Sequence, residues 1–396
     1  MPTTYGTHRS WSGDESLLGM LDLGLSGPLV DHHCHGLVRR ELDRSAFESL
    51  LNEGSGAGRH GTSAFDSMLG LAVRRWCAPV LDLPALCDPD DYLARRAELG
   101  STDVDRRFLR ASRVSDFVVD PGFEPEPISS PDDLARLAGG RAHQVVRLEK
   151  LAQDLLAAGV GADDLPARLV EALGASSAVG AKSIAAYRTG LELSATKPDE
   201  AAVCAALRAL RPEADGTVRI ADGTVTSWLA WTAIEAGLPL QLHVGYGDAD
   251  IDLHRCDPLL LSGFLRGTRE REVPVLLLHN YPFHRHASYL AQVFDHVFID
   301  LSLTVHNTGA LSRQVIAETL ELVPFGKLLY ASDAFGLSEL FYLGSVLFRR
   351  GLSDCLVPLI ESGEMGLEDA QRLTLLVGSE NARRVYSFED PVVRVT

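Results

Sequence analysis

Eight short apolar runs, separated by longer stretches with helical periodicity, are the feature that most constrains the fold of this chain. This alternation is typical of parallel sheets, because a crossover helix must return the chain before the next parallel strand begins. Eight strands predict an α/β fold, namely a closed (β/α)8 barrel of the TIM type. An open doubly wound sheet is the alternative, but no Gly-x-Gly-x-x-Gly turn follows the first run. The predicted strands are residues 29–35, 116–121, 144–149, 180–185, 238–244, 273–279, 297–303 and 327–333.

About eighty residues separate the first two predicted strands, more than one crossover helix requires. Helical patterns occur there at residues 40–53, 63–76 and 89–99. We therefore divide the chain into a lead-in segment (residues 1–27) and a barrel (residues 28–396) with a helical insertion at residues 39–112. Loops after the strands build the active face of such barrels, so the insertion is expected to shape a substrate pocket or a subunit contact. The helical pattern at residues 367–386 is expected to close the barrel.

The charge balance limits the partners of the protein. Asp and Glu outnumber Lys and Arg by 54 to 37, and a net charge of −17 argues against nucleic acid or an anionic membrane. No apolar stretch approaches the roughly twenty residues of a membrane span, and residues 1–13 do not have the pattern of a secretory signal. We expect a cytoplasmic protein whose six cysteines stay reduced, because their spacing shows no paired pattern.

The first predicted strand carries Asp31-His32-His33-Cys34-His35. Side chains of a strand alternate between its faces, so His33 and His35 point the same way, with Asp31 behind them. Two imidazoles on a rigid strand are suited to a zinc-type ion. Taken alone, the pattern also fits surface or core histidines, and Cys34 is interpreted as facing away from such a site.

Polar residues also stand near the ends of later strands. Alternation in the fifth strand places Gln241 and His243 inside the barrel, while His279 ends the sixth strand and Asp333 ends the eighth. Active sites of such barrels lie at the carboxyl ends of the strands. Buried polar groups need partners, so these residues are expected to meet each other or a shared metal ion.

On these residues the chain resembles the amidohydrolase superfamily, in the branch of amidohydrolase domains associated with glutamine synthetase, including nodulin-like and FluG-like proteins. The resemblance implies metal binding by His33, His35, His243 and Asp333, with His279 on a second metal or on the substrate. Lys182 falls where many members of the superfamily carry a carboxylated lysine that bridges two metals. The motifs that carry the resemblance are residues 30–35, 180–191, 242–243, 278–279, 331–334 and 381–386.

Two interpretations of Lys182 stay open. Burial and a nearby dication both disfavour the charged amine, and a neutral amine can react with carbon dioxide to form an anionic bridge. Alternatively, Lys182 stays charged and pairs with a carboxylate of the protein or of the substrate.

The implied cofactor is one or two divalent ions, with Zn2+ predicted and Mn2+ or Fe2+ as alternatives. An ion with an open position lowers the pKa of bound water to about 7. Asp333 is the predicted general base, which takes a proton on attack and returns it to the leaving amine. His279 is predicted to polarise the substrate carbonyl together with the metal, or else to orient a metal ligand.

Substrate contacts are predicted from charged residues near the strand ends. Arg147 and Glu149 share the inward parity of the third strand, and could bind the carboxylate and amine of an amino-acid head group or simply pair with each other. Arg188 is a second candidate for bidentate binding of a carboxylate. The residues expected to line the mouth are Tyr187, Trp76 and Glu339.

The sequence therefore predicts a metal-dependent amidohydrolase that cleaves the C–N bond of a small carboxylated substrate. The resemblance suggests γ-glutamyl amides as that substrate and a homo-oligomeric assembly. A metal-dependent decarboxylase or sugar-acid isomerase on the same barrel is one alternative, and a noncatalytic metal-binding scaffold is another. No role is assigned to His306, and the loop histidines His284 and His286 are expected to face solvent.

Overall fold

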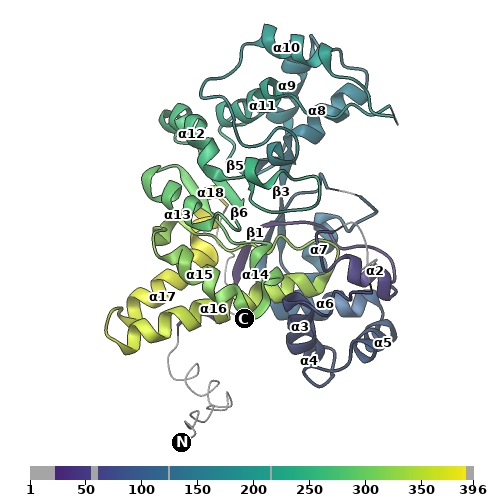
Figure 1. Ribbon diagram of the computed structural model, residues 1–396, viewed down its shortest axis with the longest axis vertical. Coiled ribbons are helices and arrows are strands. Elements are labelled where there is room, and N and C mark those ends of the chain that lie inside the picture. The colour runs from purple at the N-terminus through teal and green to yellow at the C-terminus, as the bar shows by residue number, and fades with distance from the viewer. Residues whose placement is uncertain (1–22, 55–60, 124, 215, 389–396) are drawn as a thin grey trace, which may run out of the picture.

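A computed structural model describes residues 23–54, 61–123, 125–214 and 216–388 of the chain. Seven parallel strands form one sheet in which each strand pairs with the next along the chain, and helices surround this curled sheet (Figure 1). The sheet confirms the predicted α/β barrel class. The strands are β1 (Leu29–Cys34), β2 (Val114–Val119), β3 (Arg141–Arg147), β4 (Gly180–Ser183), β5 (Leu240–Val244), β6 (Val275–His279) and β7 (Val297–Ile299).

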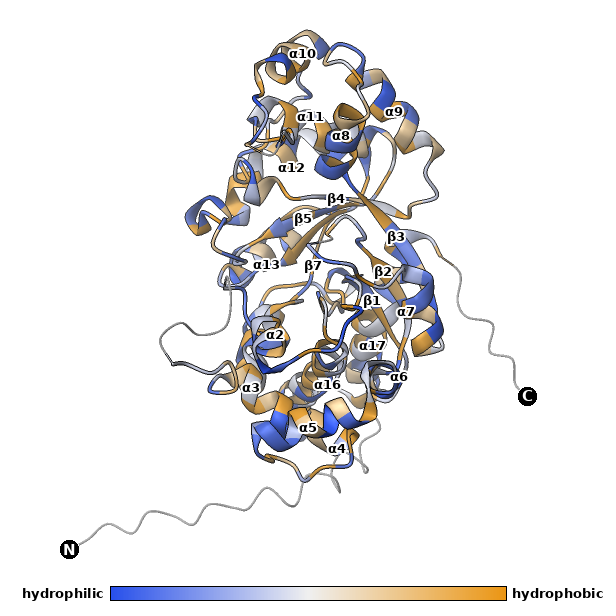
Figure 2. Ribbon diagram, turned by 90° about the vertical axis from the view of Figure 1, so that its right-hand side faces the viewer, coloured by the Kyte–Doolittle hydropathy of each residue, from blue (hydrophilic) through white to orange (hydrophobic). Residues whose placement is uncertain are grey.

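The helices lie outside the strands, and the strands are coloured largely as apolar in Figure 2. This follows from the burial of both faces of a parallel sheet, one by the helices and one by the barrel interior. The helices are α2 (Arg44–Ser49), α3 (Met68–Ala72), α4 (Ala78–Val80), α5 (Pro89–Leu99), α6 (Ser101–Ser112), α7 (Pro131–Ala138), α8 (Leu148–Ala157), α9 (Leu165–Ala175), α10 (Glu200–Ala209), α11 (Gly223–Glu235), α12 (Ser262–Thr268), α13 (His284–Val293), α14 (Thr304–Asn307), α15 (Ser312–Leu320), α16 (Ser338–Glu361), α17 (Leu367–Leu375) and α18 (Asn381–Tyr386).

The predicted eighth strand at residues 327–333 is an irregular segment, which corrects the sequence-based expectation. The segment still lies between β7 and β1. Leu329 N donates to Ile299 O of β7 at 2.9 Å, and Asp333 N donates to His33 O of β1 at 2.9 Å. The ladder is interrupted because Ser332 N donates to the carboxylate of Asp31 at 2.8 Å instead of to a backbone carbonyl.

The pairing of β1 with β2 shifts within the histidine motif. Asp31 lies opposite Phe117 and Cys34 lies opposite Val119, so three steps along β1 match two steps along β2. An extra residue of this kind redirects the side chains that follow it. His32 accordingly contacts Tyr386 inside the barrel, with Nδ1 3.1 Å from its hydroxyl oxygen.

The C-terminal helix closes one end of the barrel, as the sequence predicted. Gln241 points inward, as expected, and its Nε2 donates to the Tyr386 hydroxyl oxygen at 2.8 Å. The apolar cluster at this end joins α18 to the strands and consists of Val30, Val118, Val145, Leu276, Leu278, Leu329, Ala382, Val385 and Tyr386.

Residues 39–112 contain α2 to α6, although their standing as a separate insertion stays a prediction. Helix α5 has the predicted bounds, because Pro89 stands in its first turn and the Asp88 side chain accepts from Asp90 N at 2.8 Å. The helix predicted at residues 40–53 is shorter, at α2. The one predicted at residues 63–76 begins later, at α3, and continues through a π-helical turn (Val73–Cys77) into α4.

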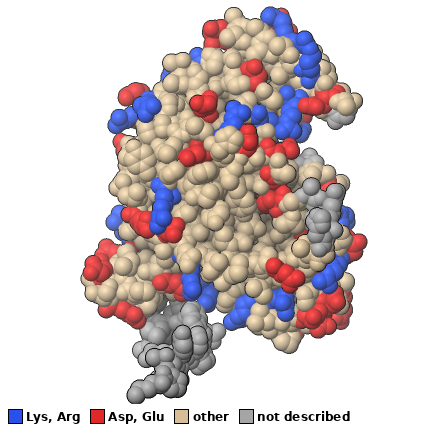
Figure 3. Space-filling model, in the orientation of Figure 1, with Lys and Arg blue, Asp and Glu red and all other residues tan. Residues whose placement is uncertain are grey.

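Within the described residues, no helix combines the length and apolar character needed to cross a bilayer. Acidic and basic side chains are interspersed on the face shown in Figure 3. All six cysteines are free.

We predict that Gly245→Ala destabilises the protein more than Gly237→Ala. Both glycines have positive φ, 82° and 72°, so each substitution carries a backbone penalty of about 1 kcal/mol. A Cβ at Gly245 would also lie 2.2 Å from Tyr281 O, whereas a Cβ at Gly237 meets nothing within 4 Å. Urea unfolding of both variants measures the difference, and equal losses would contradict this account of the turn after β5.

Candidate metal centre

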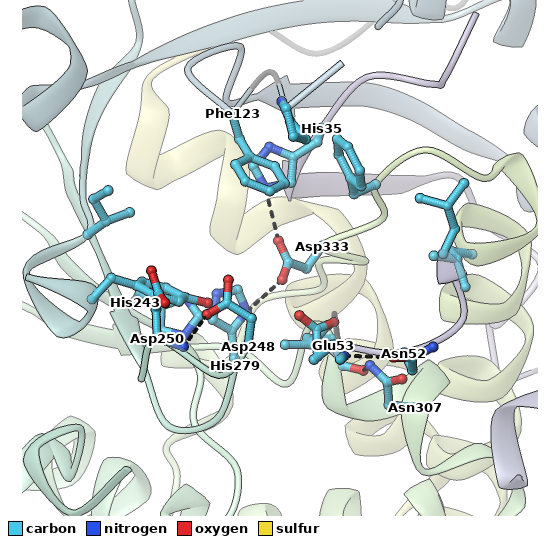
Figure 4. A pocket seen from close by; sticks show the side chains of 18 of the residues that line it. His35, Asn52, Glu53, Phe123, His243, Asp248, Asp250, His279, Asn307 and Asp333 are labelled. Carbon is cyan, nitrogen blue, oxygen red and sulfur yellow. Dashed lines mark hydrogen bonds and ion pairs between the residues drawn. The ribbon is translucent and has the colours of Figure 1, made fainter. Parts of the chain in front are cut away.

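Three donor groups from distant parts of the chain converge at the carboxyl ends of the strands (Figure 4). His33 Nε2 lies 3.1 Å from Asp333 Oδ1, and His279 Nδ1 lies 3.3 Å from Asp333 Oδ2. Donor atoms of all three residues lie within 4.8 Å of one another. Two imidazoles and a carboxylate at such distances are a ligand set that suits a divalent transition metal.

His35 extends this group, and its tautomer can be assigned. Its Nδ1 lies 2.9 Å from the backbone oxygen of Asp120, which can only accept, so Nδ1 carries the proton. The lone pair on Nε2 then faces Asp333 Oδ1 at 3.4 Å. Two electron-rich atoms this close are compatible when a cation or a proton lies between them, so the arrangement fits a bound metal.

His243 and Lys182 complete the ring of residues at the strand ends. His243 Nε2 lies 3.2 Å from Tyr246 O, which leaves Nδ1 as the lone-pair atom, and its ring centroid is 4.4 Å from that of His279. Lys182 Nζ lies 3.5 Å from His33 Nε2. Burial lowers the pKa of Lys182 to about 8, which makes the neutral amine more accessible than in an exposed lysine, although the charged form still predominates at pH 7.

A second layer of hydrogen bonds orients His279. Its Nδ1 lies 2.8 Å from Ser302 Oγ, and the Ser302 hydroxyl donates to Asp300 Oδ1 at 2.8 Å. Asp300 also accepts from His279 N at 2.7 Å. Sequence reasoning missed both residues, although their polar character just beyond β7 was an available signal.

The buried imidazoles are held neutral, as metal binding requires. Burial lowers the pKa of His33 to about 4, and it lowers the pKa values of His243 and His279 well below the usual range. Burial opposes ionisation of Asp333, but the contacts with His279 and His33 outweigh it and hold its pKa well below the ordinary value. Neutral nitrogen donors around an ionised carboxylate are thus ready for a cation.

The metal-free protein should lose stability as the pH falls from 6.5 towards 4. Burial lowers the pKa values of His33, His296 and His306 to about 4, whereas unfolded histidines titrate near 6.5. The unfolded chain therefore binds more protons in this window, which costs about 1.4 kcal/mol per pH unit for each such histidine. Urea unfolding at several pH values gives the slope.

A matched pair of variants identifies the source of that slope. His296→Gln should flatten it, because this histidine is buried with Nε2 3.2 Å from Thr268 Oγ1. His254→Gln should leave it unchanged, because the His254 side chain is 78% exposed. Equal slopes for wild type and His296→Gln would contradict the assignment.

A cavity of about 670 Å³ opens over the six candidate ligands. All six line it: His33, His35, Lys182, His243, His279 and Asp333. Its other walls are Ser49, Leu50, Leu51, Asn52, Glu53, Gly54, Leu69, Phe123, Pro125, Glu126, Arg147, Ile184, Tyr187, Arg188, Arg219, Asp248, Ala249, Asp250, Leu303, His306, Asn307, Phe335 and Leu340.

The predicted Arg147–Glu149 pair does not form. Arg147 ends β3 and instead binds Asp120 Oδ2 through Nη2 at 2.6 Å. Glu149 lies in the first turn of α8, outside the cavity lining, where it accepts from Ser183 Oγ at 2.6 Å and Ile184 N at 3.1 Å. The strand ends before Glu149, so the inward parity predicted for it does not apply.

Glu339 and Trp76 also lie away from the cavity, which corrects their predicted place at its mouth. Glu339 is fully buried and accepts from Arg96 Nε at 2.8 Å. Trp76 packs between two guanidinium groups, those of Arg75 and Arg350, at 4.3 and 4.6 Å from its ring. Both residues therefore stabilise the helices between β1 and β2 and their contact with α16.

Arg188 and Tyr187 do line the cavity. The Tyr187 ring packs 4.6 Å from that of His243. Within the described residues, Arg188 makes no ion pair, and its buried Nε has no hydrogen-bond partner. Because a buried N–H normally has an acceptor, Arg188 has an unused donor in the cavity that the candidate metal ligands line.

Several cavity residues escaped sequence reasoning. Phe123, Phe335, Arg219 and Asp248 stand in loops where no periodicity marks a face, and His306, to which no role was assigned, also lines the cavity. Their positions depend on how the loops fold over the strand ends.

A parallel α/β barrel with histidines, a lysine and an aspartate gathered at the carboxyl ends of its strands is the architecture of metal-dependent hydrolases of the amidohydrolase type. This chain belongs to the amidohydrolase family, whose family model, described as "Amidohydrolase", matches residues 126–388. Members of this superfamily depend on metal ions, in agreement with the His/Asp cluster.

Individual relatives agree with this placement. Protein fluG of Emericella nidulans is 25% identical over 406 residues, covering 92% of this chain and 46% of its own length, so the chain spans about half of that relative. A solved structure from Lactobacillus casei, described as a candidate metal-dependent hydrolase, is 25% identical with a TM-score of 0.78 and covers 94% of this chain and 97% of its own. A uronate isomerase of Thermotoga maritima shares the fold, with 14% identity, a TM-score of 0.62 and coverage of 96% and 100%.

Proposed function

We propose that this protein is a metal-dependent hydrolase of the amide C–N bond in a small carboxylated molecule, with γ-glutamyl amides as the substrate class. The observation that carries the proposal is that Asp333 lies against His33 and His279 in the same cavity that holds the unpartnered guanidinium of Arg188. A reacting centre and a site for a carboxylate thus share one cavity.

The metal would be held by His33, His279 and Asp333, whose donor atoms converge, with His35, His243 and Lys182 beside them. Nitrogen donors with one carboxylate favour zinc among the common divalent ions. Such an ion would supply a Lewis acid that polarises the substrate carbonyl and acidifies water. We propose that Lys182 carries a carboxyl group, because its amine is buried and, in the described part of the chain, no carboxylate lies within 4.0 Å of it.

Side chains of the protein would supply proton transfer, the positioning of Asp333 and the binding of the substrate carboxylate. Asp333 is ionised and lies at the base of the cavity, so its carboxylate can take a proton from the attacking water and pass it to the nitrogen of the leaving amine. His279, held by Ser302, keeps Asp333 in place from the other side. The guanidinium of Arg188 would bind the substrate carboxylate through two parallel hydrogen bonds.

Metal content and turnover of the Asp333→Asn variant test this proposal together. We expect wild-type protein to contain zinc by elemental analysis and to release glutamate from a γ-glutamyl amide panel. Asp333→Asn should keep a substantial share of its metal and lose turnover by a factor of 100 or more, as expected for a lost general base.

Asp252→Asn is the matched control, because the Asp252 side chain is 66% exposed and lies outside the cavity lining. Unchanged turnover in Asp333→Asn would remove that residue from its role. Absence of glutamate release from every amide by zinc-loaded wild type would reject the substrate class, and conversion of a uronate under the same conditions would identify an isomerase instead.

Replacing Arg188 by Ala should weaken substrate binding selectively. A charge-assisted hydrogen bond contributes about 1.5 to 3 kcal/mol, so KM should rise by about 10-fold to 150-fold while metal content stays constant. Arg266→Ala, on the exposed face of α12, is the control. An unchanged KM in Arg188→Ala would show that the substrate carboxylate binds elsewhere.

A further inference from the structure

We infer that the substrate carries an apolar group, which packs against Phe123 and Phe335 on the side of the scissile bond remote from Arg188. This inference rests on the proposed function, because it assigns the second half of the same substrate. The resulting substrate class is an amide with a carboxylated acyl group and an aromatic or branched alkyl amine as the leaving group.

Two aromatic rings flank His35 at the mouth of the cavity. The ring centroids of Phe123 and Phe335 are 4.9 Å apart, and they lie 5.6 and 6.1 Å from that of His35. Figure 4 shows Phe123 beside His35 and above Asp333. Phe123 is 37% exposed, although a large aromatic side chain is usually more deeply buried, so its ring offers contact area to a ligand.

Aliphatic side chains continue this wall. Leu50, Pro125 and Leu340 line the same cavity as the two rings. Leu50 Cδ2 lies 3.1 Å from the place where a Cβ on Gly336, the residue after Phe335, would stand. Three separate segments thus contribute apolar side chains to the same cavity, and we call this set the apolar subsite: Leu50, Phe123, Pro125, Phe335 and Leu340.

The apolar subsite and Arg188 lie on different sides of the reacting groups. Phe123 follows β2 and Phe335 follows the irregular eighth segment, so they flank the end of β1. Arg188 follows β4, three strands away from β1 in the sheet. Asp333 lies between the histidines of β1 and β6. A substrate whose carboxylate reaches Arg188 and whose carbonyl lies over Asp333 would direct its leaving group to the apolar subsite.

A cationic leaving group is the competing possibility, because Glu53, Glu126, Asp248 and Asp250 also line the cavity. Glu126 and Asp250 are paired with Arg40 and Arg219. Asp248 is exposed, so water screens its charge. Burial raises the pKa of Glu53 to about 7, with Asp333 and Asp248 adding to the effect, so much of it is neutral near neutral pH. The apolar wall is therefore the stronger determinant.

Three substrates with the same γ-glutamyl group test the inference on the zinc-loaded full chain: the benzylamide, the methylamide and the 2-aminoethylamide. All three release an alkylamine, so they differ chiefly in the group that reaches the apolar subsite. We expect kcat/KM for the benzylamide to exceed that for the other two by about 10-fold to 100-fold, as burial of an aromatic ring predicts. Phe123→Ala and Phe335→Ala should reduce this preference about tenfold, with their effect confined to the benzylamide.

Two controls separate the subsite from general damage. Phe325→Ala removes a phenylalanine that is 38% exposed and absent from the cavity lining, so it should leave the preference intact. Arg188→Ala should reduce hydrolysis of all three amides alike. Equal kcat/KM values for the three, or faster cleavage of the 2-aminoethylamide, would overturn the inference while leaving the hydrolase proposal standing. Failure to cleave any of them would reject the proposed function itself.

Discussion

The buried contact between Asp31 and Ser332 is the interaction on which the site depends. The Asp31 carboxylate accepts from Ser332 N at 2.8 Å and from Ser332 Oγ at 2.5 Å. These bonds fix the irregular eighth segment against β1, and the next residue, Asp333, is thereby held against His33. Loss of either partner would leave a buried polar group unsatisfied, which is costly in a barrel interior. The first and last parts of the barrel thus meet through this carboxylate as well as through backbone hydrogen bonds such as that from Asp333 N to His33 O, and the candidate metal site forms at that junction.

The sequence predicted the barrel class and most strand positions, because strand periodicity and polar residues at strand ends are local signals. The same signals also predicted that His33, His279 and Asp333 lie at one end of the sheet, where the structure has them. The bulge in β1 was not predictable, since it depends on the register with β2, which no local pattern encodes. The predicted eighth strand was wrong for a related reason. Its apolar run resembles a strand, but the backbone N–H of Ser332 donates to the Asp31 side chain instead of to the backbone of a neighbouring strand.

Charged residues were harder to place than metal ligands. Glu149 and Glu339 have the same chemistry as catalytic acids, yet both accept hydrogen bonds from residues of other elements. Those donors are Ser183 and Arg96, and no spacing in the sequence predicts either contact. Arg188 differs because it lacks such a partner in the described part of the chain. A structural charge therefore differs from a functional one in having hydrogen-bond or ion-pair partners within the folded protein. The apolar subsite around Phe123 escaped prediction because it is assembled from three separate segments: the end of α2, the loop after β2, and the loop before α16 with the first turn of that helix.

The central claim is that histidines distant in sequence surround a single cation site with Asp333. Anomalous diffraction from crystals of zinc-loaded protein, recorded on both sides of the zinc absorption edge, tests it most directly. The account predicts a peak between His33, His279 and Asp333, with nitrogen and oxygen ligands at about 2.0 to 2.2 Å and no sulfur. A peak at another place, or one coordinated by a cysteine, would contradict it.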